Sequence, residues 1–213
     1  DRFTSGAGNW CTWMFGRDLV NWNNNFTWAK WVTPSRDLIS AFKQEGDEVR
    51  FKESIVYYDC NWSNYYPSDN YPFMYKCRSA NSSIIKYRYA DVLLLKAEAL
   101  IMQDTPDLEG AADIIDKVRD RAKLGALPTS VRSNKNVLLN ALLKERRLEL
   151  AFEGQRWFDL VRLDKVEEVM NAVYSKDSGR KAQIYTFDKN SYRLPIPQSV
   201  IDANDKIHQN PGY

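Results

Sequence analysis

Apolar residues recur every three or four positions along the second half of the chain, a spacing that predicts amphipathic helices. We expect the first of these helices over residues 85–102. Its apolar residues lie on one face and directly beside it: Tyr89, Leu93, Ala97 and Leu100, then Val92, Leu95 and Ala99. Because apolar positions surround most of this helix, we expect it to be central and buried.

A second helix is expected over residues 108–123, after a break at residues 104–106. Its apolar positions follow one another at steps of four, three and four: Ala111, Ile115, Val118 and Ala122. Small residues on both helices allow close packing, so the pair loosely resembles a single tetratricopeptide repeat.

A further helix pair is expected around Gly154, which we predict to end one helix and permit the start of the next. The helix before it carries an apolar stripe made of Leu139, Leu142, Leu143, Leu150 and Ala151. After it, Trp157, Phe158 and Val161 share one face of a short helix. This arrangement predicts a tight helical hairpin.

Seven charged residues are interleaved in this hairpin: Glu145, Arg146, Arg147, Glu149, Glu153, Arg156 and Asp159. Paired carboxylates can perform acid–base chemistry when their surroundings separate their pKa values. Carboxylates and guanidinium groups three or four residues apart also neutralise one another, and arginine pairs well with carboxylates between helices. We favour a structural ion-pair network over a catalytic site.

Residues 1–83 lack this helical period, which predicts a loop-rich subdomain, whereas residues 84–213 form the helical core and the C-terminal tail. A short helix is expected from Pro34, with Thr33 or Ser35 as its cap and an end near Gly46. Residues 54–58 have the composition of a strand, and residues 61–72 that of a long polar and aromatic loop. The predicted fold class is therefore mainly α with an irregular aromatic subdomain.

Lysine plus arginine number 30 against 28 aspartate plus glutamate, and no block of like charge occurs, so nucleic acid is a poor candidate partner. The longest apolar run, residues 92–95, is far shorter than a membrane span. Three cysteines without C-x-x-C spacing and a distant histidine do not suggest a metal site. Of the possible disulfides, we expect Cys60–Cys77. The common catalytic and cofactor motifs are missing, so we expect neither catalysis nor a cofactor.

Aromatic residues are concentrated in the loop-like half of the chain, among asparagine, serine and glycine. Aromatic rings can stack on the apolar faces of sugars while short polar side chains bond the hydroxyl groups, although such rings can equally form a core. The candidate glycan-binding residues are Trp10, Trp13, Trp22, Trp28, Trp31, Trp62, Tyr65 and Tyr66.

Four ordered blocks of sequence carry a family resemblance. They are E-R-R-L-E-L-A-F-E-G-Q-R-W-F-D-L-V-R from Glu145, R-Y-A-D-V-L-L-L-K-A-E-A-L from Arg88, V-R-D-R-A from Val118, and L-P-I-P-Q with N-P-G-Y after Leu194. Together they resemble the C-terminal half of the SusD/RagB family of outer-membrane glycan-binding lipoproteins of Bacteroidetes.

The resemblance implies several expectations about the whole protein. It would capture glycans at the outer face of the cell outer membrane without catalysis and deliver them to a SusC-like TonB-dependent transporter. It would be lipid-anchored through an N-terminal cysteine outside this sequence. In the family a helix pair such as residues 85–123 completes a repeat array, so here it is expected to leave an apolar flank uncovered.

Two other interpretations compete with a glycan-binding surface protein. A glycoside hydrolase would explain the aromatic residues, and Asp59 and Asp69 beside Trp62 and Tyr66 are its candidate carboxylates, but the sequence does not fix their separation. A helical-repeat scaffold for protein interactions would explain residues 85–162 alone. We favour the glycan-binding protein.

Overall fold

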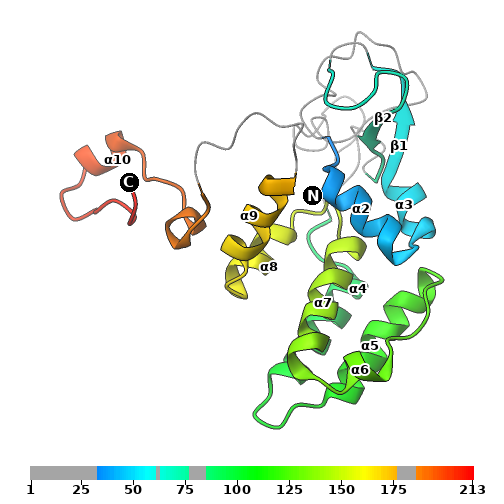
Figure 1. The fold of residues 1–213 in the computed structure, drawn as a ribbon. Coiled ribbons are helices and arrows are strands. Elements are labelled where there is room, and N and C mark those ends of the chain that lie inside the picture. Colours follow the sequence, from blue (N-terminus) through cyan, green and yellow to red (C-terminus); the bar gives the residue numbers. More distant parts are fainter. Residues whose placement is uncertain (1–32, 61–62, 77–84, 177–185) are drawn as a thin grey trace. The chain divides into compact units, whose positions relative to one another are not determined.

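The structure is a computed structural model, and it describes residues 33–60, 63–76, 85–176 and 186–213. These residues form mainly helices with two short strands, as the sequence predicts (Figure 1). The chain divides into two compact units, residues 1–156 and residues 157–213. The predicted boundary near residue 84 stays a prediction.

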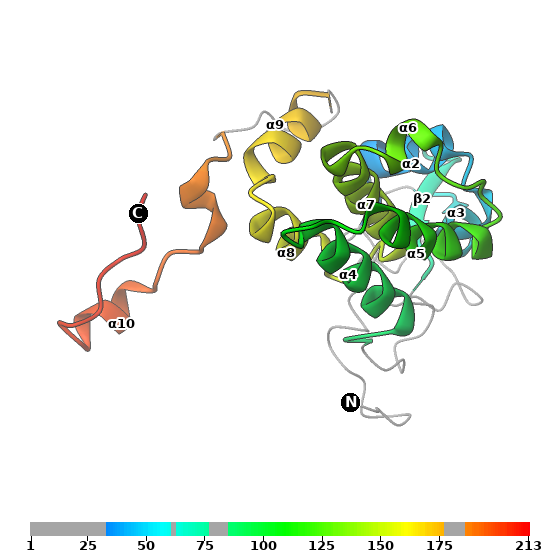
Figure 2. The same cartoon turned by 90° about the horizontal axis from the view of Figure 1, so that it is seen from below.

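Four helices form the helical body of the first unit. They are α4 (Tyr89–Met102), α5 (Leu108–Arg121), α6 (Thr129–Arg132) and α7 (Lys135–Glu149). Helix α4 packs against α5 and α7, and α6 packs against α7 (Figure 2). Their common core is fully apolar and consists mainly of Leu94, Ala97, Ile101, Ala111, Ala112, Ile115, Val118, Leu138 and Leu142. The predicted buried stripe of α5 is therefore confirmed.

Helix α4 differs from the sequence prediction in its start and in its buried face. It begins at Tyr89 because Arg88 is extended, with φ −146° and ψ 163°. The residues that it buries are Asp91, Leu94, Ala97 and Ile101, whereas Tyr89, Val92 and Leu95 are exposed. Because this helix is apolar on most sides, its sequence does not indicate which side meets α5 and α7, and the predicted burial does not hold for Tyr89, Val92 and Leu95.

The prediction of a short helix after Pro34 is confirmed by α2 (Arg36–Glu45). The Ser35 side chain accepts a hydrogen bond from the Leu38 amide, and Gly46 ends the helix with φ 68°. The apolar residues of α2, Leu38, Ile39 and Phe42, are buried. They pack with Ile55, Leu148 and Ala151 in a second core cluster, which fixes α2 to the end of α7.

A second short helix, α3 (Glu48–Ser54), was not expected from the sequence. The Asp47 side chain caps it through the Arg50 amide. It leads into strand β1 (Ile55–Tyr58), which pairs antiparallel with β2 (Tyr71–Met74) in the register Ile55↔Met74. Strand β1 was predicted, whereas residues 71–72 of β2 were assigned to a loop.

Helix α7 ends at Glu149, five residues before the glycine that was predicted to end it. The Glu149 carbonyl accepts hydrogen bonds from Lys76 Nζ and Arg88 Nη2, both at 2.6 Å. Cations are favourable at this negative end of a helix, and here they satisfy a carbonyl that the helix leaves unpaired. Gly154, with φ 80°, lies in the following turn.

The second unit contains α8 (Arg156–Arg162), α9 (Val166–Lys176), the 3₁₀ helix η2 (Lys189–Tyr192) and α10 (Gln198–Asp202). Helix α8 buries Asp159 and Leu160, whereas Phe158, which we placed on its apolar face, is 66% exposed. Asp159 is only 3% exposed and pairs with Arg162 at 2.8 Å, which agrees with the expectation that charged residues of this stretch form ion pairs.

The C-terminal tail folds back on itself through contacts within residues 193–213. The Gln209 side chain bonds both the amide and the carbonyl of Ile196, at 2.8 and 2.9 Å. The Tyr213 hydroxyl donates to the Arg193 carbonyl at 3.2 Å. Polar contacts of side chains with backbone thus hold the tail in shape.

Candidate functional site

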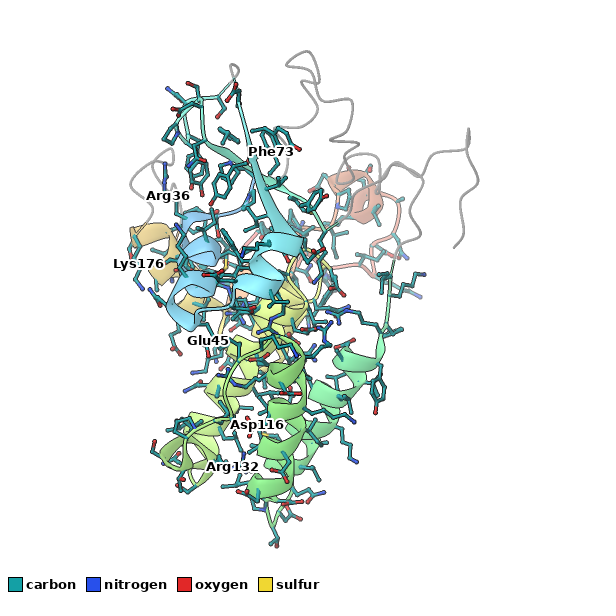
Figure 3. The ribbon with its side chains drawn as sticks, turned by 90° about the vertical axis from the view of Figure 1, so that its right-hand side faces the viewer. Arg36, Glu45, Phe73, Asp116, Arg132 and Lys176 are labelled. Carbon is teal, nitrogen blue, oxygen red and sulfur yellow. The ribbon has the colours of Figure 1, made fainter. Side chains whose placement is uncertain are left out.

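Aromatic side chains gather around the hairpin at the end of the first unit opposite α5 and α6. The loop between β1 and β2 carries Tyr65 and Tyr66, and β2 contributes Tyr71 and Phe73. We call this group, together with Arg36 at the start of α2, the aromatic cluster. Arg36 and Phe73 are labelled in Figure 3. The second core cluster anchors α2 to α7. The aromatic cluster therefore lies next to a tightly packed part of the first unit.

The two candidate tyrosines of this loop lie against one another and against an arginine. Their rings are 4.8 Å apart at an interplanar angle of 84°, an edge-to-face contact. The Arg36 Cζ atom lies 4.0 Å from the Tyr65 ring centroid and 4.9 Å from that of Tyr66. The guanidinium also donates to the Tyr65 carbonyl. One cation therefore holds both rings and the loop backbone.

Hydrogen bonds fix the remaining rings of the cluster. The Tyr66 hydroxyl donates to the Pro34 carbonyl at 2.8 Å. Tyr71, which lies 5.5 Å from the Tyr66 ring, donates from its hydroxyl to Ser63 Oγ at 3.1 Å. Tyr71 and Phe73 are fully buried, whereas Tyr65 and Tyr66 are half-buried. The first two rings therefore belong to the core, and the second two remain partly accessible.

This arrangement has the parts that sugar recognition needs. Tyr65 and Tyr66 are partly accessible, and the Arg36 guanidinium and backbone carbonyl groups lie beside their rings. Rings that are already held in place lose little conformational freedom when a ligand binds. The cluster can therefore act as a stacking surface for a sugar ring.

The structure brings together two of the eight candidate residues, Tyr65 and Tyr66. The other six are tryptophans outside the described residues, and their role stays a prediction: Trp10, Trp13, Trp22, Trp28, Trp31 and Trp62.

Sequence reasoning missed Arg36, the residue that connects the two tyrosines. It is the first residue of α2, where the helix dipole disfavours a positive charge. A positive charge at this position therefore suggests a role other than stabilising the helix. In the structure that role is the contact of Arg36 with the rings of Tyr65 and Tyr66.

The described residues do not support the alternative of an enzyme active site or a metal site. Asp59 and Asp69, the candidate glycosidase carboxylates, are both exposed, so neither lies in an apolar pocket of the kind that surrounds an acid catalyst. Within the described ranges, no group of three or more metal-ligating side chains is close enough to hold an ion. Cys60 is buried, and its expected disulfide partner Cys77 lies outside the described residues, so the Cys60–Cys77 pairing stays a prediction.

Four of the seven charged residues singled out in the sequence, Glu145, Arg146, Glu149 and Glu153, belong to a largely buried ion-pair network, as we predicted. Arg50 Nη1 lies 2.6 Å from Glu145 and 3.1 Å from Glu149, and its Nε donates to Asp47. Arg146 bonds Asp91 at 2.9 Å with both side chains buried. Arg50 and Asp91 are network members that the sequence did not reveal, because they lie far from the hairpin along the chain.

A second part of the network surrounds the end of α7. Arg88 pairs with Glu149 at 2.5 Å and with Glu153 at 2.7 Å, and Arg121 also contacts Glu149. Lys76 adds a bond of 2.5 Å to Glu153. These contacts connect residues beside β2, beside α4 and at the end of α5 to the end of α7 and the turn that follows it. The role of this part of the network is therefore structural.

The pKa shift of Glu149 agrees with a structural role for this carboxylate. Burial acts to raise the pKa of Glu149, but hydrogen bonds and charges from Arg88, Arg121 and Arg50 outweigh it and lower the pKa to about 2. Burial raises the pKa of Glu145 despite its contacts with Arg50 and Arg119. A carboxylate held ionised by three arginines is a poor proton donor at neutral pH.

In the described part of the chain, no helix is long and apolar enough to cross a membrane.

Residues 74–213 match the model of the family described as "SusD family". The SusD-like protein P38 of Formosa agariphila is 43% identical over 99 residues, which cover 44% of this chain and 19% of that protein.

Solved structures agree with this match. A SusD superfamily protein from Bacteroides vulgatus has a TM-score of 0.66 at 22% identity and covers 85% of this chain and 44% of that one, which shows a shared fold. A laminarin-binding SusD-like protein has a TM-score of 0.56 at 28% identity and covers 85% of this chain and 38% of that one. The chain therefore spans less than half the length of these relatives.

Proposed function

The chain belongs to the SusD family, and from this premise we propose that it captures glycans at a non-catalytic binding surface made by the aromatic cluster and by tryptophans of residues 10–31 and Trp62. The observation that carries the proposal is the Arg36–Tyr65–Tyr66 arrangement, in which one guanidinium holds two partly accessible rings. A relative with 28% identity that binds laminarin supports the same ligand class.

The experiment that tests this function is a calorimetric titration of the 213-residue chain with a panel of oligosaccharides that includes laminarin fragments. We expect weak binding of at least one glycan, with a dissociation constant on the order of micromolar to millimolar. If no member of a broad neutral and acidic panel binds, the function is refuted.

A glycoside hydrolase remains the alternative that the aromatic residues favour. A reducing-sugar assay separates it from a binding protein, because a hydrolase releases new chain ends from the same oligosaccharides. We expect no release by this chain, and a rate that saturates with glycan concentration would replace our proposal.

We further propose that the whole protein lies at the outer face of the outer membrane as a lipoprotein and passes the glycan to a TonB-dependent transporter. The family membership supports this placement. Affinity purification of the full-length protein from membranes is expected to bring a TonB-dependent β-barrel transporter with it, and repeated purification without such a transporter would contradict the delivery role.

A further inference from the structure

Ion pairs hold both ends of helix α2, the helix that carries the arginine of the aromatic cluster. Arg36 and Glu45, labelled in Figure 3, are its first and last residues. Beside Arg36, the Asp37 carboxylate is bonded to Arg147 of α7, with 2.5 Å between Oδ2 and Nη2. At the other end, Glu45 accepts a hydrogen bond from Arg119 Nη1 of α5 at 2.7 Å. The two ends of the helix are therefore tied to different partners.

Between its two ends, α2 is held by apolar contacts. Leu38, Ile39 and Phe42 pack with Leu148 and Ala151 in the second core cluster. The burial of apolar surface stabilises this packing but is non-directional, so it does little to fix the rotation of the helix about its own axis. Charge-assisted hydrogen bonds have a defined geometry. The ion pairs therefore set the rotation of α2, and each of them acts mainly on its own end.

The pair at the start of α2 is partly shielded from water. The Arg147 side chain is 19% exposed and that of Asp37 is 24% exposed. Salt screens such a pair less than a fully exposed one. Asp37 also lies in the first turn of the helix, where the helix dipole favours a negative charge and so offsets the unfavourable position of Arg36. Two favourable interactions of Asp37 thus hold the turn that carries Arg36.

We propose that Arg147, acting through Asp37, is a positioning residue of the glycan-binding surface, an inference that rests on the function proposed above. The pair sets the orientation of the first turn of α2. This orientation places the Arg36 guanidinium against the rings of Tyr65 and Tyr66 and beside the Tyr65 carbonyl. Without the pair the helix start can rotate, and the two rings lose the cation that holds them in place for a ligand.

Calorimetry on the 213-residue chain tests the proposal, with the oligosaccharide of the panel that binds most tightly as the probe. Arg147→Met keeps a long side chain and removes the charge. It should weaken binding about two- to fivefold at a temperature at which the variant is fully folded. In a chain that already carries Arg36→Met it should cause no further loss, because Arg147 acts through Arg36. An unchanged affinity in Arg147→Met, or the same loss in both backgrounds, would overturn the proposal.

Glu45→Gln at the other end of α2 is the matched control. It weakens the contacts of this helix with Arg119 and Lys144. The site is nine residues from Arg36, about 13 Å along the axis at 1.5 Å per residue. This variant should lower the melting temperature and leave glycan affinity unchanged. A loss of affinity equal to that of Arg147→Met would show that any weakening of α2 disturbs the surface, which would overturn the specific role of Arg147.

Nuclear magnetic resonance of the Arg36 side chain gives a measurement that needs no glycan. The Arg36 Cζ atom lies 4.0 Å from the Tyr65 ring centroid, and an aromatic ring shifts the resonances of protons above its face upfield. In Arg147→Met the Arg36 resonances should move toward those of an unfolded chain, whereas Glu45→Gln should leave them in place.

The same spectra separate the positioning role from the proposed function. If no glycan binds, the function is refuted, and the shift of the Arg36 resonances in Arg147→Met still decides whether this residue positions Arg36. If glycan binds and these resonances stay unchanged in Arg147→Met, the positioning role is overturned and the function stands.

Discussion

The Arg36 guanidinium lies over the Tyr65 ring, with Cζ 4.0 Å from the ring centroid, and donates to the carbonyl of the same residue. This contact joins the start of α2 to the loop between β1 and β2. Arg36→Met is expected to weaken glycan binding about two- to tenfold, because the loop loses its preferred orientation, with a stability loss of about 0.5–1 kcal/mol. Calorimetry and thermal melts measure the two effects.

Lys43→Met on the same helix is the matched control for this substitution. Lys43 is exposed in the last turn of α2, and its replacement should change neither glycan affinity nor stability beyond about 0.5 kcal/mol. Equal effects of the two variants on affinity would remove Arg36 from the binding surface.

The buried network should make Glu149 one of the most sensitive positions for stability. Glu149→Gln leaves Arg50 and Arg88 with an incomplete set of partners in a buried environment, which should cost about 3–5 kcal/mol of unfolding free energy. Chemical denaturation measures this loss. Glu48→Gln, which breaks an exposed pair with Lys52, should cost less than about 1 kcal/mol. Similar values for the two variants would contradict the structural role of the network.

The lowered pKa of Glu149 predicts acid sensitivity. Its folded-state pKa of about 2 lies below the reference value of 4.5, so this group contributes stability above pH 4.5 that is lost as the pH falls toward 2. The contribution is on the order of 1–3 kcal/mol. Glu145 acts in the opposite direction, because its folded-state pKa is raised. Unfolding free energies at pH 6 and pH 3 should therefore differ less in Glu149→Gln than in the wild type, and an equal difference would contradict the Glu149 contribution.

The two turns that follow α2 and α7 require glycine for their backbone conformation. Gly46 and Gly154 have φ of 68° and 80°, and at both sites an added Cβ atom would have no neighbour within 4 Å. Alanine should therefore cost about 1–2 kcal/mol at each site through backbone strain alone. Gly125→Ala, which introduces a side chain into open space without a positive φ, is the control and should be close to neutral in thermal melts. A neutral effect at Gly46 would show that α2 ends differently.

Local signals account for the parts of the fold that the sequence predicted. Ser35 and Gly46 mark the two ends of α2 because capping depends on nearby residues. Strand β2 was missed because its local sequence signals do not indicate a strand. All four of its residues are buried, so the alternation of a half-buried strand is lost, and Pro72 argues against a strand in the sequence.

Long-range contacts account for what the sequence did not reveal. Arg50 and Glu145 are separated by 95 residues along the chain, and Arg36 and Tyr65 by 29. Residues so far apart leave no periodic pattern in the sequence. Only the fold therefore shows which residues form the ion-pair network and the aromatic cluster. The exposed side of α4 could not be predicted either. This helix is apolar on most sides, so its sequence does not indicate which side contacts α5 and α7.

The most direct test of the account is calorimetry on single alanine variants of the eight aromatic candidates, with a thermal melt of each variant. Tyr71→Ala serves as the core control, because this ring is buried and its loss should lower the melting temperature. We predict that at least one of the tryptophan or tyrosine variants loses glycan binding by about 1–3 kcal/mol at an unchanged melting temperature. If every variant either binds like the wild type or loses affinity only together with stability, the proposed glycan-binding surface is contradicted.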